Sequence, residues 1–185
     1  MEKINNDLLA HPTHVIYVHG SPKIVRSQGL GNGILLNGLN QYLDAGKDVA
    51  CKGNLDNCPK GFTLRFKVKP FQLLDRTYFV SSAPIDVYYR NERLVADVRT
   101  PVKEWTVSTA DVVRNAWQQV DISWHPVDGL SLFINGTSVD RDNAPVTNEE
   151  DYNATKRFLV GRANTNMRRE SYANVSKPIM GLQDK

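Results

Sequence analysis

Apolar and polar residues alternate in short runs along most of the chain, and turn-forming residues separate the runs. In the clearest run, residues 62–68, even-numbered positions are apolar, odd-numbered positions are polar, and Pro70 follows. Because successive side chains of a β-strand point to opposite faces, this run predicts a strand with one buried face. Other runs predict strands at residues 14–19, 33–37, 41–44, 78–81, 85–89, 94–98, 105–108, 117–124, 130–134 and 158–160.

Two dipeptides, Asp128-Gly129 and Asn135-Gly136, predict tight turns around the run at 130–134. Asn-Gly between apolar runs favours a type I′ turn, because both central residues then need a positive φ. Only residues 110–117 and 164–171 leave room for a helical turn, and neither keeps a period of 3.6. The pattern predicts one all-β domain over residues 1–185, with two antiparallel sheets packed face to face.

Aromatic residues are expected mainly in the core of this domain. Tyr88 and Tyr89 are neighbours on one predicted strand, so one of them should face outward. The aromatic residues expected inside are Phe62, Phe66, Trp117, Trp124 and Phe133.

Composition narrows the class of protein only slightly. The chain has 185 residues, of which 41% are hydrophobic and 23% charged, which suits a globular domain with a proper core. A formal net charge of +3 is too small to imply a nucleic-acid partner or an acidic membrane surface. No apolar run is long enough to span a bilayer, and the first ten residues lack the apolar region of a signal peptide.

Catalytic and cofactor motifs are incomplete. His19-Gly20 follows a strand as in α/β-hydrolases, but the Gly-x-Ser-x-Gly elbow is missing. Residues 29–33 resemble half a dinucleotide loop, but a strand follows where a helix is needed. His14 and His19 would point to opposite faces of a strand, so we expect surface or half-buried histidines and no shared metal. No catalytic residue is assigned, and the protein is not expected to be an enzyme.

Five segments carry a resemblance to a known family. They are residues 33–46, 61–70, 117–124, 129–136 and 158–162. In order and spacing they are similar to the signatures of laminin G-like domains, which belong to the concanavalin A-like lectin and glucanase superfamily. Lys67 stands where that family usually has Trp. The resemblance covers about residues 31–162 and implies a jelly-roll sandwich of two antiparallel sheets.

The closing strand of that family is not evident before Lys185. Either residues 172–182 replace it, or the chain is truncated at its C-terminus. Because a missing strand would leave an exposed edge, which native sandwiches avoid, we expect the natural protein to continue beyond Lys185.

The resemblance implies an extracellular protein, either secreted or the ectodomain of a membrane protein. In an oxidising compartment Cys51 and Cys58 would form a small disulfide loop, whereas in the cytosol they would be free thiols. The six residues between them exclude a CxxC redox or zinc spacing. Sequons at Asn135, Asn153 and Asn174 lie at a hairpin tip and in loops, where N-glycans fit.

Two charged stretches are candidate ligand sites. The acidic stretch offers oxygen ligands for calcium, as in some laminin G-like domains, and its residues are Asp140, Asp142, Glu149, Glu150 and Asp151. It matches no fixed ligand motif, so a solvated loop is the alternative, and no other cofactor is implied. The basic stretch, residues 156–177, offers a site for sulfated glycans, with a solvated basic face as the alternative. Its candidate glycan-binding residues are Arg157, Arg162, Arg168 and Arg169.

These observations favour a non-catalytic extracellular recognition module with a protein or glycan ligand, as part of an adhesion or receptor protein. One alternative is a structural spacer without its own ligand. The other is a glycan-active enzyme of the superfamily, which needs paired carboxylates in a Glu-x-Asp-x-Glu-type spacing. Residues 149–153 lack the second glutamate of that pattern.

Overall fold

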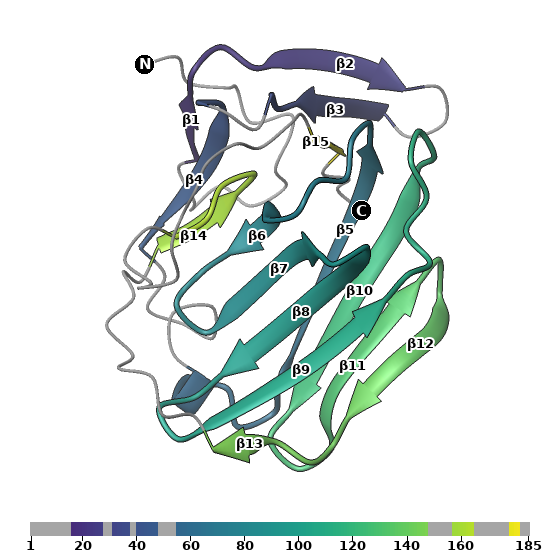
Figure 1. Cartoon of the computed structure of the whole chain (residues 1–185). Helices are drawn as coiled ribbons and strands as arrows, with labels where there is room; N and C mark the ends of the chain where they lie inside the picture. The colour runs from purple at the N-terminus through teal and green to yellow at the C-terminus, as the bar shows by residue number, and fades with distance from the viewer. Residues whose placement is uncertain are drawn as a thin grey trace.

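The computed structural model describes residues 16–27, 31–37, 40–47, 55–147, 157–164 and 178–181. Within them the chain forms two antiparallel sheets that face each other (Figure 1). The strand order of sheet A is β1 (Tyr17–His19), β4 (Tyr42–Lys47), β14 (Arg157–Val160), β6 (Thr77–Ser81), β7 (Ile85–Arg90), β8 (Arg93–Arg99), β9 (Lys103–Thr109) and β13 (Val146–Thr147). The order of sheet B is β12 (Thr137–Asp142), β11 (Gly129–Ile134), β10 (Gln118–His125), β5 (Phe62–Pro70), β15 (Pro178–Gly181), β3 (Gly31–Leu35) and β2 (Lys23–Ser27). A 3₁₀ turn, η2 (Leu55–Asn57), precedes β5.

The core lies between the two sheets and is built from alternate positions of their strands. The Phe66 ring of β5 packs on the Phe79 ring of β6, with centroids 6.5 Å apart. Ile122 of β10 and Val98 of β8 are also fully buried. Burial of each such side chain stabilises the fold by about 1.5–3 kcal/mol, so apolar alternation is what holds the sandwich together.

The predicted all-β fold is therefore confirmed, as are two of its local signals. Along β5, burial alternates in the sense that the sequence indicates, with Phe66 and Val68 inside and Thr63 and Arg65 exposed. At the turn between β11 and β12, Asn135 and Gly136 have φ values of 51° and 81°. Both central residues are thus left-handed, as a type I′ turn requires.

Residues 137–142 form strand β12 instead of leading into an acidic loop. β12 is an edge strand of sheet B and, among the described strands, pairs with β11 alone, with a bulge between Leu132 and Phe133. Its burial pattern shows no fully buried residue, so it lacks the apolar alternation that marks a core strand. Asp140 and Asp142 thus belong to a strand, and the expectation that they lie in a loop was wrong.

Strand β15 lies between β5 and β3 in the middle of sheet B. Ile179 pairs with Lys69 of β5 on one side and with Leu35 of β3 on the other. This is the position at which an exposed edge was expected, and residues 178–181 fill it. The reason for expecting a continuation beyond Lys185 is therefore removed, and the domain boundaries stay a prediction.

One of the two adjacent tyrosines faces outward, as predicted, but it is not exposed. Tyr89 points into the core, and Tyr88 points to the outer face of sheet A but is only 7% exposed. The Tyr88 hydroxyl donates to Asp97 at 3.0 Å, and its ring stacks on Tyr78. Phe133 also departs from expectation, because it lies on the face of β11 opposite the buried Leu132.

Candidate functional site

The outer face of sheet A at its β1 edge brings together aromatic and charged side chains. Val18 of β1 and Leu43 of β4 are paired and point into the core. Because side chains alternate along a strand, the flanking residues of both strands point outward. The backbone register places His19 opposite Tyr42 and Tyr17 opposite Asp44 on this outer face.

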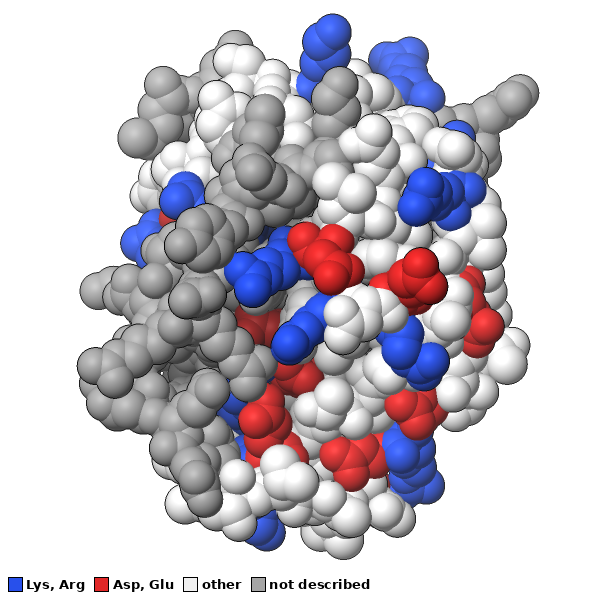
Figure 2. Space-filling view, in the orientation of Figure 1, with Lys and Arg blue, Asp and Glu red and all other residues white. Residues whose placement is uncertain are grey.

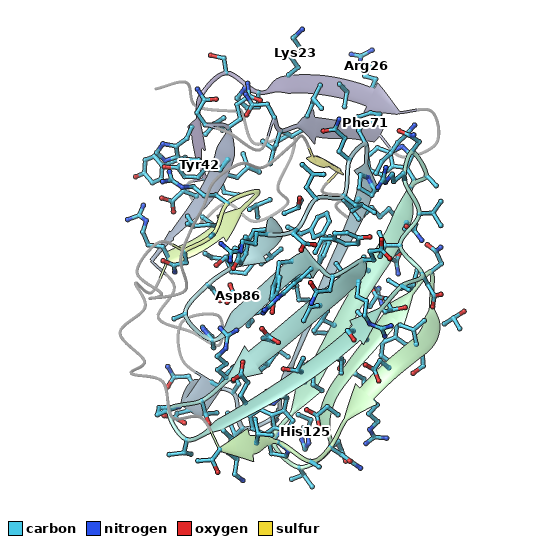
Figure 3. All side chains as sticks on the ribbon, in the orientation of Figure 1. Lys23, Arg26, Tyr42, Phe71, Asp86 and His125 are labelled. Carbon is cyan, nitrogen blue, oxygen red and sulfur yellow. The ribbon has the colours of Figure 1, made fainter. Side chains whose placement is uncertain are left out.

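His19 and Tyr42 form a parallel aromatic stack. Their ring centroids are 4.1 Å apart and the ring planes differ by 5°. Cross-strand aromatic pairs of this kind contribute about 0.5–1.5 kcal/mol beyond burial, so each ring fixes the other. In Figure 3, Tyr42 lies on the outer side of β4, well away from Asp86 of β7.

Arg162 lies over the Tyr42 ring. Its guanidinium carbon is 4.8 Å from the ring centroid, which is the geometry of a cation–π interaction. Gly161, just before it, has a φ of 82°, and its N–H donates to the Phe79 carbonyl at 3.0 Å. A Cβ at this glycine would come within 2.5 Å of Leu36. The turn that delivers Arg162 to the ring therefore needs glycine.

Asp44 and Arg157 form an ion pair beside the stack. Asp44 is 4% exposed, and its Oδ2 accepts from Nε of Arg157 at 2.8 Å and from Nη2 of the same residue. Its Oδ1 accepts from the Gly46 N–H at 2.8 Å. The hydrogen bond with Asp44 raises the pKa of Arg157 above its usual value. Nε2 of His19 is 3.9 Å from Asp44, which links the pair to the stack.

We call this arrangement the Tyr42 cluster, defined as His19, Tyr42, Asp44, Arg157 and Arg162. The Asp44 carboxylate is matched by Arg157, whereas Arg162 is exposed and no carboxylate of the described residues lies within ion-pair distance of it. Apart from His19, the cluster has two guanidinium groups and one carboxylate, which sum to a charge of +1. The cluster thus presents one unmatched cation on an aromatic support.

A second charged group lies further along the same face, on β7, β8 and β9. The Arg99 guanidinium donates to Asp86 at 2.7 Å, to Asp97 at 2.8 Å and to Glu104 at 2.8 Å. Arg99 is 2% exposed, and Asp86 and Asp97 are buried with it, whereas the Glu104 side chain is 16% exposed. Burial lowers the pKa of Arg99, but Asp86 and Asp97 outweigh it and hold that pKa above its usual value.

Asp86 is one of the two buried carboxylates of this group. Burial raises the pKa of Asp86, against the opposing effects of Arg99 and of the Ser81 hydroxyl, which donates at 2.6 Å. The arrangement is an ionic network that ties three strands together. Where Figure 2 is not grey, basic and acidic side chains are interspersed over this face, and no large patch of one sign is seen.

Two of the four arginines proposed to bind glycans, Arg157 and Arg162, are brought together in the Tyr42 cluster. Their roles differ, because Arg157 is held by a buried carboxylate and Arg162 is exposed. Arg168 and Arg169 lie outside the described residues.

The carboxylates of Asp140 and Asp142 are engaged with backbone groups. Their four oxygens accept from the N–H groups of Ser108, Arg141, Thr106 and Ala144, at 2.7–2.9 Å. No group of three metal-ligating side chains occurs in the part of the chain that the structure describes. Glu149, Glu150 and Asp151 lie outside that part, and a calcium site with all five residues stays a prediction.

Cys58 is buried at the end of η2 and is disulfide-bonded. Cys51 lies outside the described residues, so the bridge between the two stays a proposal. Asn135 is exposed at a hairpin tip, as expected, and its Oδ1 accepts from the Gln119 N–H at 2.8 Å. Asn153 and Asn174 lie outside the described residues.

The aromatic half of the Tyr42 cluster was missed by sequence reasoning. His19 was expected to be a surface or half-buried histidine and is half-buried, but its stack with Tyr42 was not foreseen. The stack depends on the pairing of β1 with β4, which two separate alternating runs do not specify. The local signal is weak: His19 ends β1 and Tyr42 begins β4.

No family model and no curated protein matches this chain. Solved structures match it in fold. The binding domain of a paraclostridial mosquitocidal protein superposes with a TM-score of 0.64 at 14% identity, over 92% of this chain and 43% of that one. The binding domain of a botulinum neurotoxin of serotype D/C gives 0.64 at 12% identity, over 92% and 43%.

A third structure is of botulinum neurotoxin type C, whose cell entry depends on interaction with two ganglioside molecules. It superposes with a TM-score of 0.64 at 11% identity, over 92% of this chain and 42% of that one. The chain thus spans less than half the length of these similar structures. At such low identity the likeness shows a shared β-sandwich fold. Within the described residues, no helix is long and apolar enough to cross a membrane.

Proposed function

We propose that this protein is a non-catalytic recognition module of the laminin G-like type, which binds a glycan or protein ligand through the Tyr42 cluster. The observation that carries the proposal is the exposed Arg162, held at 4.8 Å over the Tyr42 ring without a carboxylate partner among the described residues. An exposed arginine fixed against an aromatic ring is a group that binding sites use for orientation and specificity.

The solved structures of similar fold support this class of function. Two of them are binding domains of toxins, and a third belongs to a toxin whose cell entry involves gangliosides. A rigid sandwich can hold binding side chains in fixed positions, and the pairing of β1 with β4 holds His19 and Tyr42 of the Tyr42 cluster in this way.

The geometry favours binding over glycan hydrolysis. Glycosidases need two carboxyl groups that reach the scissile bond from opposite sides. Asp86 and Asp97 form a pair of carboxylates on the outer face of sheet A. Both are hydrogen-bonded to Arg99 and buried. Asp44 is buried and bonded to Arg157.

An extracellular location is part of the proposal. It is supported by the disulfide-bonded Cys58 and by the exposed sequon asparagine at Asn135. Expression through a secretory pathway, followed by glycosidase treatment and mass measurement, tests this part. A loss of glycan mass supports it, and an unchanged mass argues against glycosylation.

Binding is tested on a glycan array and on intact cells with labelled wild type and Tyr42→Ala. Loss of the ring removes the support of both His19 and Arg162, so binding should fall at least about tenfold. Arg114→Gln, a change of an exposed arginine distant from the cluster in the β9–β10 loop, is the control for charge. Circular dichroism and thermal unfolding show whether Tyr42→Ala still folds. Wild type that binds nothing would instead support the structural spacer.

A further inference from the structure

We infer that the Tyr42 cluster takes a sugar that carries a single carboxylate, and that Arg162 receives this carboxylate. The inference rests on the proposed function and specifies its ligand class. It follows from the charge of the cluster, the position of Arg162 over the Tyr42 ring and the exposed Tyr17 on the same face.

Arg162 is set up to bind an anion. Its backbone is fixed by Gly161, whose N–H is bonded to the Phe79 carbonyl, and its guanidinium rests on the Tyr42 ring. A guanidinium held in this way loses little freedom on binding, and its planar array of N–H donors matches the two oxygens of a carboxylate. Because Arg162 is exposed, those donors are open to a ligand.

Arg157 does not add a second free charge. Nε and Nη2 of Arg157 both donate to the buried Asp44, so its charge is matched within the protein. Arg157 is therefore a positioning residue, whose positive charge balances the negative charge of Asp44 beside the stacked rings. A polysulfated chain binds through several unmatched cations at once, with a steep dependence on salt. A site with a net charge of +1 suits one carboxylate instead.

The body of the sugar has aromatic rings to pack on. Tyr17 is 41% exposed and lies two residues from His19 on the same face of β1. Exposed ring faces pack against the C–H groups of a pyranose, while the polar edges of the rings offer hydrogen bonds to its hydroxyls. Rings and arginine are neighbours on one face, so one acidic sugar can contact both.

The test uses chemically matched probes. Sialyllactose and methyl β-glucuronide carry one carboxylate, their methyl esters lack the charge, and lactose and methyl β-glucoside are the neutral parents. Binding is followed by NMR, through the Nε–H signal of Arg162 and the backbone signals of β1 and β4. We expect at least one acid to bind and to shift the Arg162 signal, and its ester and neutral parent to bind at least about tenfold more weakly.

Variants distinguish the effect of the Arg162 charge on binding from an effect on folding. Arg162→Gln should weaken binding of the acidic sugar at least about tenfold, and Arg162→Lys should bind with intermediate affinity, because it keeps the charge but loses the planar donors. Arg114→Gln removes the same charge elsewhere and should bind like wild type. Thermal unfolding confirms that each variant is folded.

The outcomes distinguish the two proposals. Equal binding of acid and ester, or acid binding that Arg162→Gln leaves unchanged, overturns the single-carboxylate inference while the recognition function stands. Binding of heparin in preference to the single acids, with steep salt dependence, also overturns it. Failure of wild type on the glycan array and on cells overturns the proposed function itself.

Discussion

Oδ2 of Asp140 accepts a 2.7 Å hydrogen bond from the backbone N–H of Ser108, although the two residues lie in strands of different sheets. Oδ2 of Asp142 accepts in the same way from the Thr106 N–H at 2.9 Å. The outermost strand of sheet B, β12, thus covers donors of β9 that the short strand β13 does not reach. Unpaired edge donors invite association with other strands, and here two carboxylates cap them.

The first prediction concerns this contact between the sheets. Asp140→Ala should lower the free energy of unfolding by about 1–3 kcal/mol, because it leaves the Ser108 N–H without its acceptor. Asp140→Asn keeps an acceptor oxygen and should cost less. Urea unfolding measures the loss, and hydrogen exchange of the Ser108 amide should speed up in parallel. Asp128→Ala, which removes an exposed carboxylate 3.1 Å from Nδ1 of His125, is the control and should change stability by less than about 1 kcal/mol.

The second prediction concerns the unequal burial of Asp44 and Arg157, whose side chains are 5% and 39% exposed. Arg157→Ala strands a buried carboxylate, whereas Asp44→Asn leaves an arginine that can turn to solvent. We expect Arg157→Ala to cost about 1–3 kcal/mol and Asp44→Asn less, since partial exposure reduces the cost of a fully buried pair. In a double-mutant cycle, the second change should recover part of the loss from the first. Equal costs would contradict this asymmetry.

The third prediction concerns the Tyr88 hydroxyl. Tyr88→Phe removes the hydrogen bond to the buried Asp97 and should lower stability by about 1–2 kcal/mol, measured by chemical unfolding. Tyr89→Phe is the matched control, because its hydroxyl makes no hydrogen bond with the described residues. It should be nearly neutral. Similar losses for both variants would mean that ring packing, not the hydrogen bond, sets the cost.

The fourth prediction concerns pH. Burial raises the pKa of Asp86 above its ordinary value of 3.8. A carboxyl whose pKa is raised by folding contributes stability that is complete below the ordinary value and is lost as pH rises through the folded value. We therefore expect wild type to lose stability relative to Asp86→Asn as the pH rises above the ordinary carboxyl pKa of 3.8 and through the raised pKa of folded Asp86. The lost contact with Arg99 adds an offset that does not depend on pH in this range.

Unfolding of both proteins in urea at several pH values measures this difference. Asp128→Asn, which removes an exposed carboxylate, serves as the reference for the general effect of charge. A difference that is constant with pH, or that moves in favour of wild type, would show that the ion pair with Arg99 dominates over burial.

The fifth prediction concerns the disulfide proposed between Cys51 and Cys58. Because the loop is short, the bridge should stabilise the fold by about 2 kcal/mol. Cys51→Ser should therefore lower the thermal midpoint, and reductant should lower that of wild type but not that of the variant. Two reactive thiols in wild type purified under oxidising conditions would refute the bridge.

The class of fold and several of its strands could be predicted from the sequence. Alternation in β5 has a period of two, which only a strand with one buried face satisfies, and the Asn135-Gly136 turn needs positive φ values that these two residues adopt easily. Such signals are local, so they can be recognised in the sequence without knowledge of the partner strands.

Strands β12 and β15 and the candidate site depend on tertiary structure. β12 has no buried residue, so its strand conformation depends on pairing with β11 and on the contacts of Asp140 and Asp142 with β9. β15 is a strand because it fills the gap between β5 and β3.

By itself, the sequence determined the alternation that makes a sandwich and placed Arg157 and Arg162 in a basic stretch. Only the tertiary structure decided that Arg157 is matched by Asp44 and that Arg162 rests on Tyr42 beside His19. The physical reason is register: residues far apart in the chain meet on one face only when strands pair in one alignment, and burial of the opposite faces fixes that alignment.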